Sequence, residues 1–121
     1  MFINGKWVTA SKRLNVINPY NGDIVGVVSE AGEEELDEAI EYAHRAFSLT
    51  KKLPVYKKTE ILKYIANRIK EEKEDFAKLI TLEAGKPIKD SRVEVDRAIN
   101  TFTLASEEVS RIHGEYFPLD I

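Results

Sequence analysis

Hydrophobic and polar positions alternate at the start of the chain in the manner of short antiparallel strands. Asn4-Gly5 is a residue pair that accepts the two positive φ angles of a type I′ hairpin turn. Further on, Pro19 presets φ for a turn, and Gly22 accepts a left-handed conformation. We therefore predict that residues 1–30 form a small antiparallel β unit. In chain order, its strands and turns are expected at Phe2-Ile3, Asn4-Gly5, Trp7-Val8, Leu14–Ile17, residues 18–22 and Asp23–Val28.

From Gly32 onward, apolar residues recur every three or four positions, which is the spacing of one helix face. Glu33–Glu35 suit the first turn of a helix, where the dipole favours anions. We expect a later helix to break within the charged segment 71–75, Gly85 to end the helix that follows, and Pro87 to open the next. The expected inner stripes are Leu36, Ala39, Ile40, Ala43 and Phe47, then Ile61, Leu62, Ile65 and Ile69, then Phe76, Leu79 and Ile80.

The last helix has the clearest pattern, because its apolar positions lie alternately three and four residues apart in one continuous seam. This seam needs a partner surface, either the preceding helices or something outside this chain. Gly114 is expected to end the helix, and residues 115–121 are expected to be an extended tail. The predicted fold class is α+β, with antiparallel β-hairpins over 1–30 followed by three to four helices over 32–114. The seam consists of Val95, Ala98, Phe102, Ala105, Val109 and Ile112.

Composition narrows the functional classes. The chain is 43% hydrophobic with a formal net charge of −3, and its charges are interspersed, whereas a nucleic-acid surface would need clustered positive charge. The longest aliphatic stretch, residues 24–28, is too short to cross a bilayer, and residues 1–5 lack the pattern of a secretory signal. We therefore expect a cytoplasmic location without nucleic-acid or membrane partners.

The absence of cysteine excludes disulfides, thiolate metal ligands and a cysteine nucleophile within these residues. The chain also lacks glutamine and is rich in Lys and Glu, as are many heat-adapted proteins. No phosphate-cradling motif of the form G-x-G-x-x-G or G-x-x-x-x-G-K-S/T is present.

Four residues merit comparison as candidates for chemistry. We expect His44 to flank a helix stripe and His113 to suit the last turn of the final helix, where the dipole favours a cation. Glu83 continues the expected face of the third stripe, so it is either a partly buried general base or, more simply, a structural residue that forms an ion pair or accepts hydrogen bonds from backbone N–H groups. Trp7 is expected to be a packing anchor. We assign no catalytic, cofactor-binding or metal-binding residue to this chain.

Taken together, the motifs resemble the N-terminal region of the NAD(P)-dependent aldehyde dehydrogenase superfamily, in order and in spacing over essentially the whole chain. Leu82–Pro87, which is similar to the family's "LExGKP", is the most specific of the matching segments. The others are Ile3–Val8 ("INGxW"), Asn18–Gly26 ("NPxxGxxxG"), Ala39–Phe47 ("AxxxAxxAF") and Arg111–Glu115 (the "GE" after the next helix).

The resemblance implies an α/β parent enzyme with a Rossmann-type domain, in which a cysteine attacks the aldehyde and hydride passes to NAD or NADP. A glutamate then activates the hydrolytic water, and an asparagine and backbone N–H groups hold the oxyanion. These residues belong to parts of the family pattern that follow this chain, so none is transferred to it, and no cofactor is expected to bind here. Glu83 and Lys86 match a family motif whose implied role is structural.

The leading hypothesis is therefore an inactive N-terminal fragment, covering residues 1–121, of an aldehyde dehydrogenase. Its parent resembles archaeal enzymes that act on a small aldehyde such as lactaldehyde, succinate semialdehyde or glyceraldehyde 3-phosphate. The expected partner is the rest of the enzyme chain, or a homo-oligomer, through the helix face from Val95 to Ile112. One alternative is a stand-alone assembly module that uses the same face, and another is a helical structural domain whose resemblance is accidental.

Overall fold

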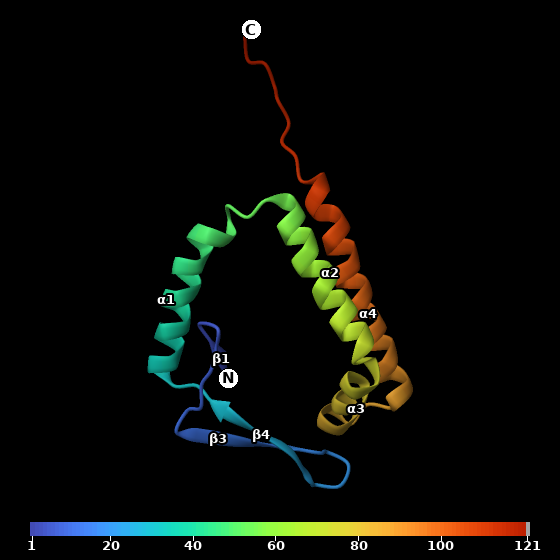
Figure 1. The fold of residues 1–121 in the computed structure, drawn as a ribbon. Helices are drawn as coiled ribbons and strands as arrows, with labels where there is room; N and C mark the ends of the chain where they lie inside the picture. Colours follow the sequence, from blue (N-terminus) through green and yellow to red (C-terminus); the bar gives the residue numbers. More distant parts are fainter. Residues whose placement is uncertain (121) are drawn as a thin grey trace.

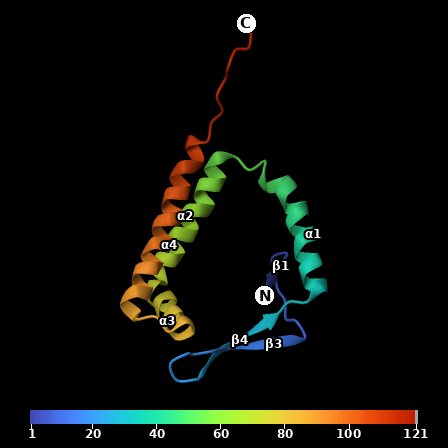
Figure 2. The same cartoon turned by 180° about the vertical axis from the view of Figure 1, so that it is seen from behind.

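The computed structural model describes residues 1–120, which form two antiparallel hairpins followed by helices (Figure 1). In both views, the β3–β4 ribbon, α1 and the α2–α4 helix pair lie along the three sides of a triangle, and the C-terminal segment extends away from it (Figures 1 and 2). The predicted fold class is therefore confirmed. The elements are β1 (Phe2–Ile3), β2 (Lys6–Trp7), β3 (Lys12–Ile17), β4 (Ile24–Glu30), α1 (Glu33–Thr50), α2 (Val55–Glu71), α3 (Lys73–Ala84), α4 (Ile88–Glu108) and a short 3₁₀-helix, η1 (Val109–Arg111).

Local turn chemistry sets both hairpins. Asn4 and Gly5 have φ values of 51° and 75°, so the first hairpin turns in the predicted left-handed conformation. Phe2 pairs with Trp7 across it. The second hairpin pairs β3 with β4 antiparallel, with a register shift between Val16 and Ile17.

Helix α1 begins as predicted at its acidic first turn, and the Glu35 carboxylate accepts a hydrogen bond from Gly32 N at 2.8 Å. Its expected apolar stripe is present but uncovered, because no residue of α1 is buried. Ile40 is 57% exposed and Phe47 is 60% exposed. Among the described elements, α1 contacts β1, so most of its apolar face is open.

Helices α2, α3 and α4 pack together and form most of the core. The predicted break falls at Glu72, between α2 and α3, and Gly85 ends α3 with φ 68°. We had expected Pro87 to be the first helical residue of α4. It is instead the N-cap, and the helix begins at the next residue. The predicted inner stripe of α2 needs one correction: Ile61 is half exposed, and Ala66 is the buried residue.

The seam of α4 faces its neighbours within the chain. Val95 is buried, and Ala98, Phe102, Ala105 and Val109 are half-buried. Because α2 and α3 are the helices packed on α4, they supply the surface that this seam needs, which is the first of the two alternatives considered. The buried hydroxyls Ser91 and Ser106 lie on the same face of the helix.

The C-terminal end differs from the sequence-based expectation. The α-helix ends at Glu108, and η1 covers the next residues to Arg111, so Gly114 does not end the helix. Ile112 is extended and 82% exposed, which removes it from the packed seam. Residues 112–120 have no regular secondary structure.

Candidate functional site

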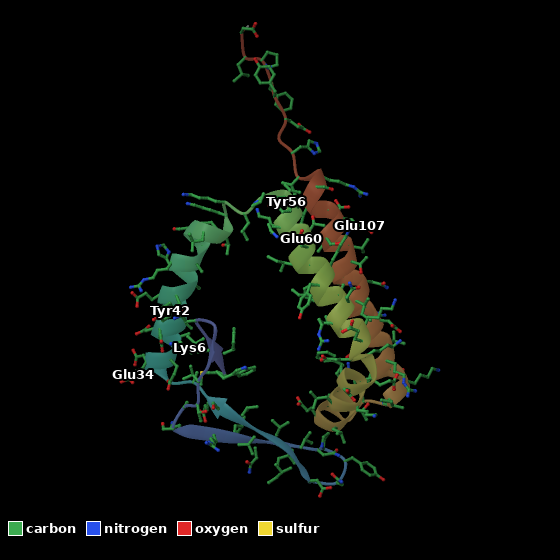
Figure 3. All side chains as sticks on the ribbon, viewed as in Figure 1. Lys6, Glu34, Tyr42, Tyr56, Glu60 and Glu107 are labelled. Atoms are coloured by element: carbon green, nitrogen blue, oxygen red, sulfur yellow. The ribbon has the colours of Figure 1, made fainter. Side chains whose placement is uncertain are left out.

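The four residues considered for chemistry lie on different parts of the fold. Trp7 is on β2, His44 on α1, Glu83 on α3 and His113 beyond η1, and all four are exposed. Charged side chains are likewise dispersed over the helices, with Glu34 on α1 and Glu60 and Glu107 on α2 and α4 (Figure 3). The structure therefore brings no acid–base or nucleophile–base pair together from these candidates.

Two of the expected environments need correction. Glu83 was expected to be partly buried, but α3 buries Ala77 and half-buries Ile80 and Thr81, so its packed face is rotated away from Glu83. His113 was expected in the last turn of the final helix, but it follows η1. Its Nδ1 lies 2.6 Å from the Arg111 carbonyl oxygen, so the ring hydrogen-bonds locally and does not cap a long helix.

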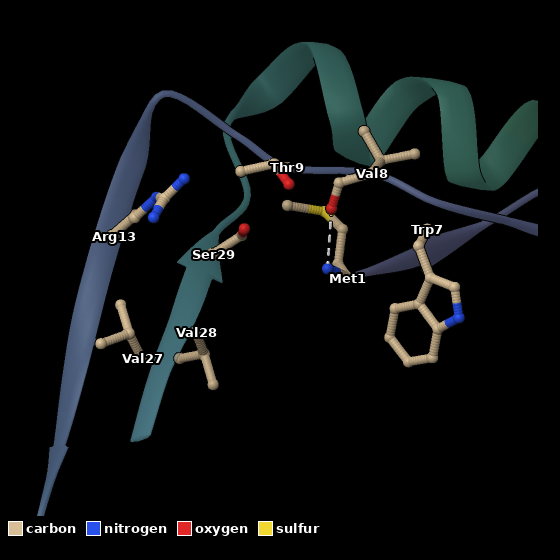
Figure 4. Close-up of a pocket in the computed structure, with 8 residues that line it drawn as sticks. All are labelled: Met1, Trp7, Val8, Thr9, Arg13, Val27, Val28 and Ser29. Carbon is tan, nitrogen blue, oxygen red and sulfur yellow. Dashed lines mark hydrogen bonds between the residues drawn. The ribbon is translucent and has the colours of Figure 1, made fainter. Parts of the chain in front are cut away.

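A hollow of about 520 Å³ lies beside the N-terminus (Figure 4). The Met1 ammonium donates a hydrogen bond to the Val8 carbonyl oxygen at 2.9 Å, and Val8 N donates to the Met1 carbonyl oxygen at 2.8 Å. Trp7 packs edge-on against Phe2, with ring centroids 5.4 Å apart, but is 84% exposed, so it anchors only one side of the hairpin. The lining residues are Met1, Trp7, Val8, Thr9, Arg13, Val27, Val28 and Ser29.

The polar groups of this hollow do not form a catalytic set. Arg13 supplies a permanent cation that cannot act as a base, and the Ser29 hydroxyl already accepts a hydrogen bond from Ala10 N at 3.4 Å. No carboxylate or imidazole lines the hollow, so nothing there would activate the hydroxyl of Thr9 or Ser29.

Three ion pairs that the sequence did not reveal connect α3 and the α3–α4 turn to α4. Arg92 holds Glu74 with a forked pair of contacts, Nε to Oε1 at 3.0 Å and Nη2 to Oε2 at 2.9 Å. This hydrogen bond from Arg92 is the main reason that the pKa of Glu74 is lowered from its ordinary value. The other pairs are Lys73 with Asp96 and Lys86 with Glu94.

The charges at the helix N-termini differ among the helices. The first turns of α1, α3 and α4 contain acidic residues, which oppose a pyrophosphate there, whereas the first turn of α2 contains no acidic residue. Among residues 1–120, no group of three His, Asp or Glu side chains gathers at metal-binding distance. No helix in this part of the chain has both the length and the apolar character needed to cross a membrane.

Comparison with known proteins identifies relatives that are longer than this chain. The model of the aldehyde dehydrogenase family matches residues 7–120. The lactaldehyde dehydrogenase of Methanocaldococcus jannaschii is 43% identical over 120 residues, which cover 99% of this chain and 26% of that protein. The chain thus spans about a quarter of the length of such relatives.

Solved structures agree with this family match. The betaine aldehyde dehydrogenase of Staphylococcus aureus, in complex with NAD⁺, superposes with a TM-score of 0.93 at 31% identity, covering 99% of this chain and 25% of that one. The glyceraldehyde-3-phosphate dehydrogenase GapN of M. jannaschii, complexed with NADP, gives a TM-score of 0.85 at 43% identity, covering 88% and 24%. The arrangement of hairpins and helices described above therefore recurs within complete enzymes.

Proposed function

The chain belongs to the aldehyde dehydrogenase family, and from this premise we propose that it is the N-terminal part of an enzyme that uses NAD or NADP to oxidise a small aldehyde to its carboxylate. The observation that carries the proposal is the family match over residues 7–120 in a chain that contains no cysteine. The resemblance assigns the attack on the aldehyde to a cysteine, so the reacting groups belong to the remainder of the polypeptide. This chain serves as scaffold and is inactive alone.

For the substrate, we propose an aldehyde of the lactaldehyde class. The support is the 43% identity to the lactaldehyde dehydrogenase of M. jannaschii and the 32% identity to a 3-sulfolactaldehyde dehydrogenase of Priestia megaterium. Relatives with solved structures hold NAD⁺ in one case and NADP in another, and either cofactor suits the proposal. No step of the reaction is assigned to the residues of this chain.

The exposed apolar faces support the scaffold role. The stripe of α1 and the β3–β4 ribbon, where Val27 and Val28 are half exposed, leave apolar area in water that further protein would cover. We had expected the seam of α4 to contact the rest of the enzyme or a second copy of the chain. Because α2 and α3 already pack on most of the seam, that contact is left to the exposed Ile112 at the end of the seam.

Split-protein complementation tests the proposal. The remainder of the enzyme, expressed without residues 1–121, should show little aldehyde-dependent NAD(P)H formation, and co-expression with this chain should restore it. The chain alone should give no turnover with lactaldehyde. Turnover by the chain alone would contradict the scaffold role.

The alternative function is a stand-alone assembly module, which the uncovered face of α1 also favours. The same experiment separates the two functions. A stand-alone module would assemble with itself or another protein and would not restore the activity of an aldehyde dehydrogenase that lacks the matching region.

A further inference from the structure

Two sequence motifs that the proposed function leaves without a role meet at one corner of the molecule. The turn at residues 18–22, between β3 and β4, lies against residues 82–87, between α3 and α4 (Figure 1). Asn18 and Tyr20 from the turn line a shallow hollow together with Gly85 and other residues of the α3–α4 turn. This proximity was not apparent from the sequence, where the two motifs are far apart.

The closest approach is between Gly85 and Pro19. Gly85 has φ +68°, a left-handed conformation that disfavours any residue with a Cβ. A Cβ on Gly85 would also lie 2.8 Å from Pro19 Cγ, inside van der Waals contact. The proline ring is closed onto its own backbone, so it cannot swing aside as a long side chain can. Gly85 is therefore required both for its backbone conformation and for this contact.

Both sides of the contact are held by their own hydrogen bonds. In the β turn, Asn18 is buried, its N donates to the Asp23 carbonyl oxygen at 2.8 Å, and its Oδ1 accepts from Tyr20 N at 3.0 Å. On the helical side, the hydroxyls of Thr81 and Ser91 are 2.9 Å apart. The contact thus joins two locally fixed surfaces.

The contact between Pro19 and Gly85 closes the third corner of the triangle. The other two corners of the triangle are covalent, at residues 31–32 between β4 and α1 and at residues 51–54 between α1 and α2 (Figures 1 and 2). We propose that Pro19 and Gly85 form a clasp, a noncovalent closure that holds the arm of residues 1–54 against the helical unit of residues 55–111. Without the clasp, the arm is joined to the helices through the loop before α2.

A label-to-label distance in the 121-residue chain tests the clasp independently of any enzymatic activity. Because the chain has no cysteine, Asn15→Cys on β3 and Lys89→Cys on α4, both exposed, accept spin labels uniquely. Double electron–electron resonance, with the labelled chain diluted into unlabelled chain so that only intramolecular pairs are measured, should give one narrow distance in this background. Gly85→Ala should lengthen and broaden it, and adding Pro19→Ala should restore it, because that change removes the ring atom that the new Cβ meets.

Gly5→Ala is the matched control. Gly5 has φ +75°, close to that of Gly85, but nothing lies within 4 Å of its virtual Cβ, so it tests left-handed strain without the steric contact. It should leave the distance unchanged. The clasp is refuted if Gly85→Ala behaves like Gly5→Ala. It is equally refuted if the Pro19→Ala/Gly85→Ala variant stays as disrupted as Gly85→Ala. This second comparison still tests the clasp if circular dichroism shows that Gly85→Ala alone has unfolded, because the double variant is then expected to refold.

Discussion

At the scale of single residues, Glu74 and Arg92 show how much a tertiary contact adds to sequence reasoning. The sequence places Glu74 four residues before Lys78, a spacing that suits an ion pair on one helix. In the structure, its carboxylate is instead taken by Arg92 of α4 through a forked contact. Lys73 and Lys78 lower the pKa of Glu74 only as further nearby charges, after the hydrogen bond from Arg92.

This pair predicts a pH dependence. Since the folded state lowers the pKa of Glu74 below its ordinary value of 4.5, the pair stabilises the fold above pH 4.5, and that stabilisation is lost as the pH falls through the lowered pKa. Glu74→Gln should therefore lower the melting temperature by a few degrees at about pH 7, and the difference should vanish near about pH 3. Thermal unfolding followed by circular dichroism at both pH values measures this. Glu115→Gln, in the C-terminal segment, is the control, and an equal loss at both pH values would refute the argument.

At the scale of elements, the seam of α4 predicts that the same substitution destabilises the fold strongly on one face of the helix and weakly on the other. Phe102 lies in the seam and is half-buried, whereas Leu104 is 59% exposed on the other side. Phe102→Asp should lower the free energy of unfolding by about 2–3 kcal/mol, because it removes apolar contact and brings a charge to the helix interface. Leu104→Asp should change it by less than about 0.5 kcal/mol. Urea denaturation of both variants measures the difference, and equal losses would mean that the seam does not face α2 and α3.

The elements also show where sequence reasoning succeeds and where it stops. The Asn4-Gly5 turn and the helix end at Gly85 were predictable because each depends on the conformation of one or two residues. The inward face of α3 was predicted only in part. Ile80 is half-buried as expected, but Phe76 is exposed, and Ala77 is the residue that the neighbouring helices bury. Close helix packing favours the small side chain, and no rule of spacing along one helix contains that information.

The candidate functional residues likewise include features that the sequence revealed and features that it did not. The sequence identified the motif around Gly85 through its resemblance to a family, but it could not tell that Pro19 lies against that glycine. The closeness of the two depends on the path of the whole chain around the triangle (Figure 2). Likewise, the exposure of Glu83 follows from the rotation of α3, which the tertiary packing sets.

At the scale of the whole molecule, the most distinctive feature is that the apolar surface is unevenly covered. Helices α2, α3 and α4 cover one another, whereas the stripe of α1, formed mainly by Leu36, Ile40 and Phe47, is more than half exposed at each of these positions. Exposed apolar patches of this kind favour association in water. The isolated chain should therefore self-associate as its concentration rises.

Charging the α1 stripe should have opposite effects in the isolated chain and in the complete enzyme. In the isolated chain, Ile40→Lys with Phe47→Lys should weaken self-association at least about tenfold, or about 1.4 kcal/mol, and should leave the melting temperature nearly unchanged because no residue of α1 is buried. In the complete enzyme, where we propose that further protein covers this stripe, the same pair should reduce the yield of folded protein, since it buries two charges. Sedimentation velocity over a concentration series measures the first effect, and the soluble yield of the full-length variant measures the second. Glu34→Gln with Glu38→Gln, at two exposed positions of α1 outside the stripe, raises the net charge by the same two units and is the control. If the complete enzyme with Ile40→Lys and Phe47→Lys gives as much soluble protein as the control, the stripe of α1 remains exposed to water there too.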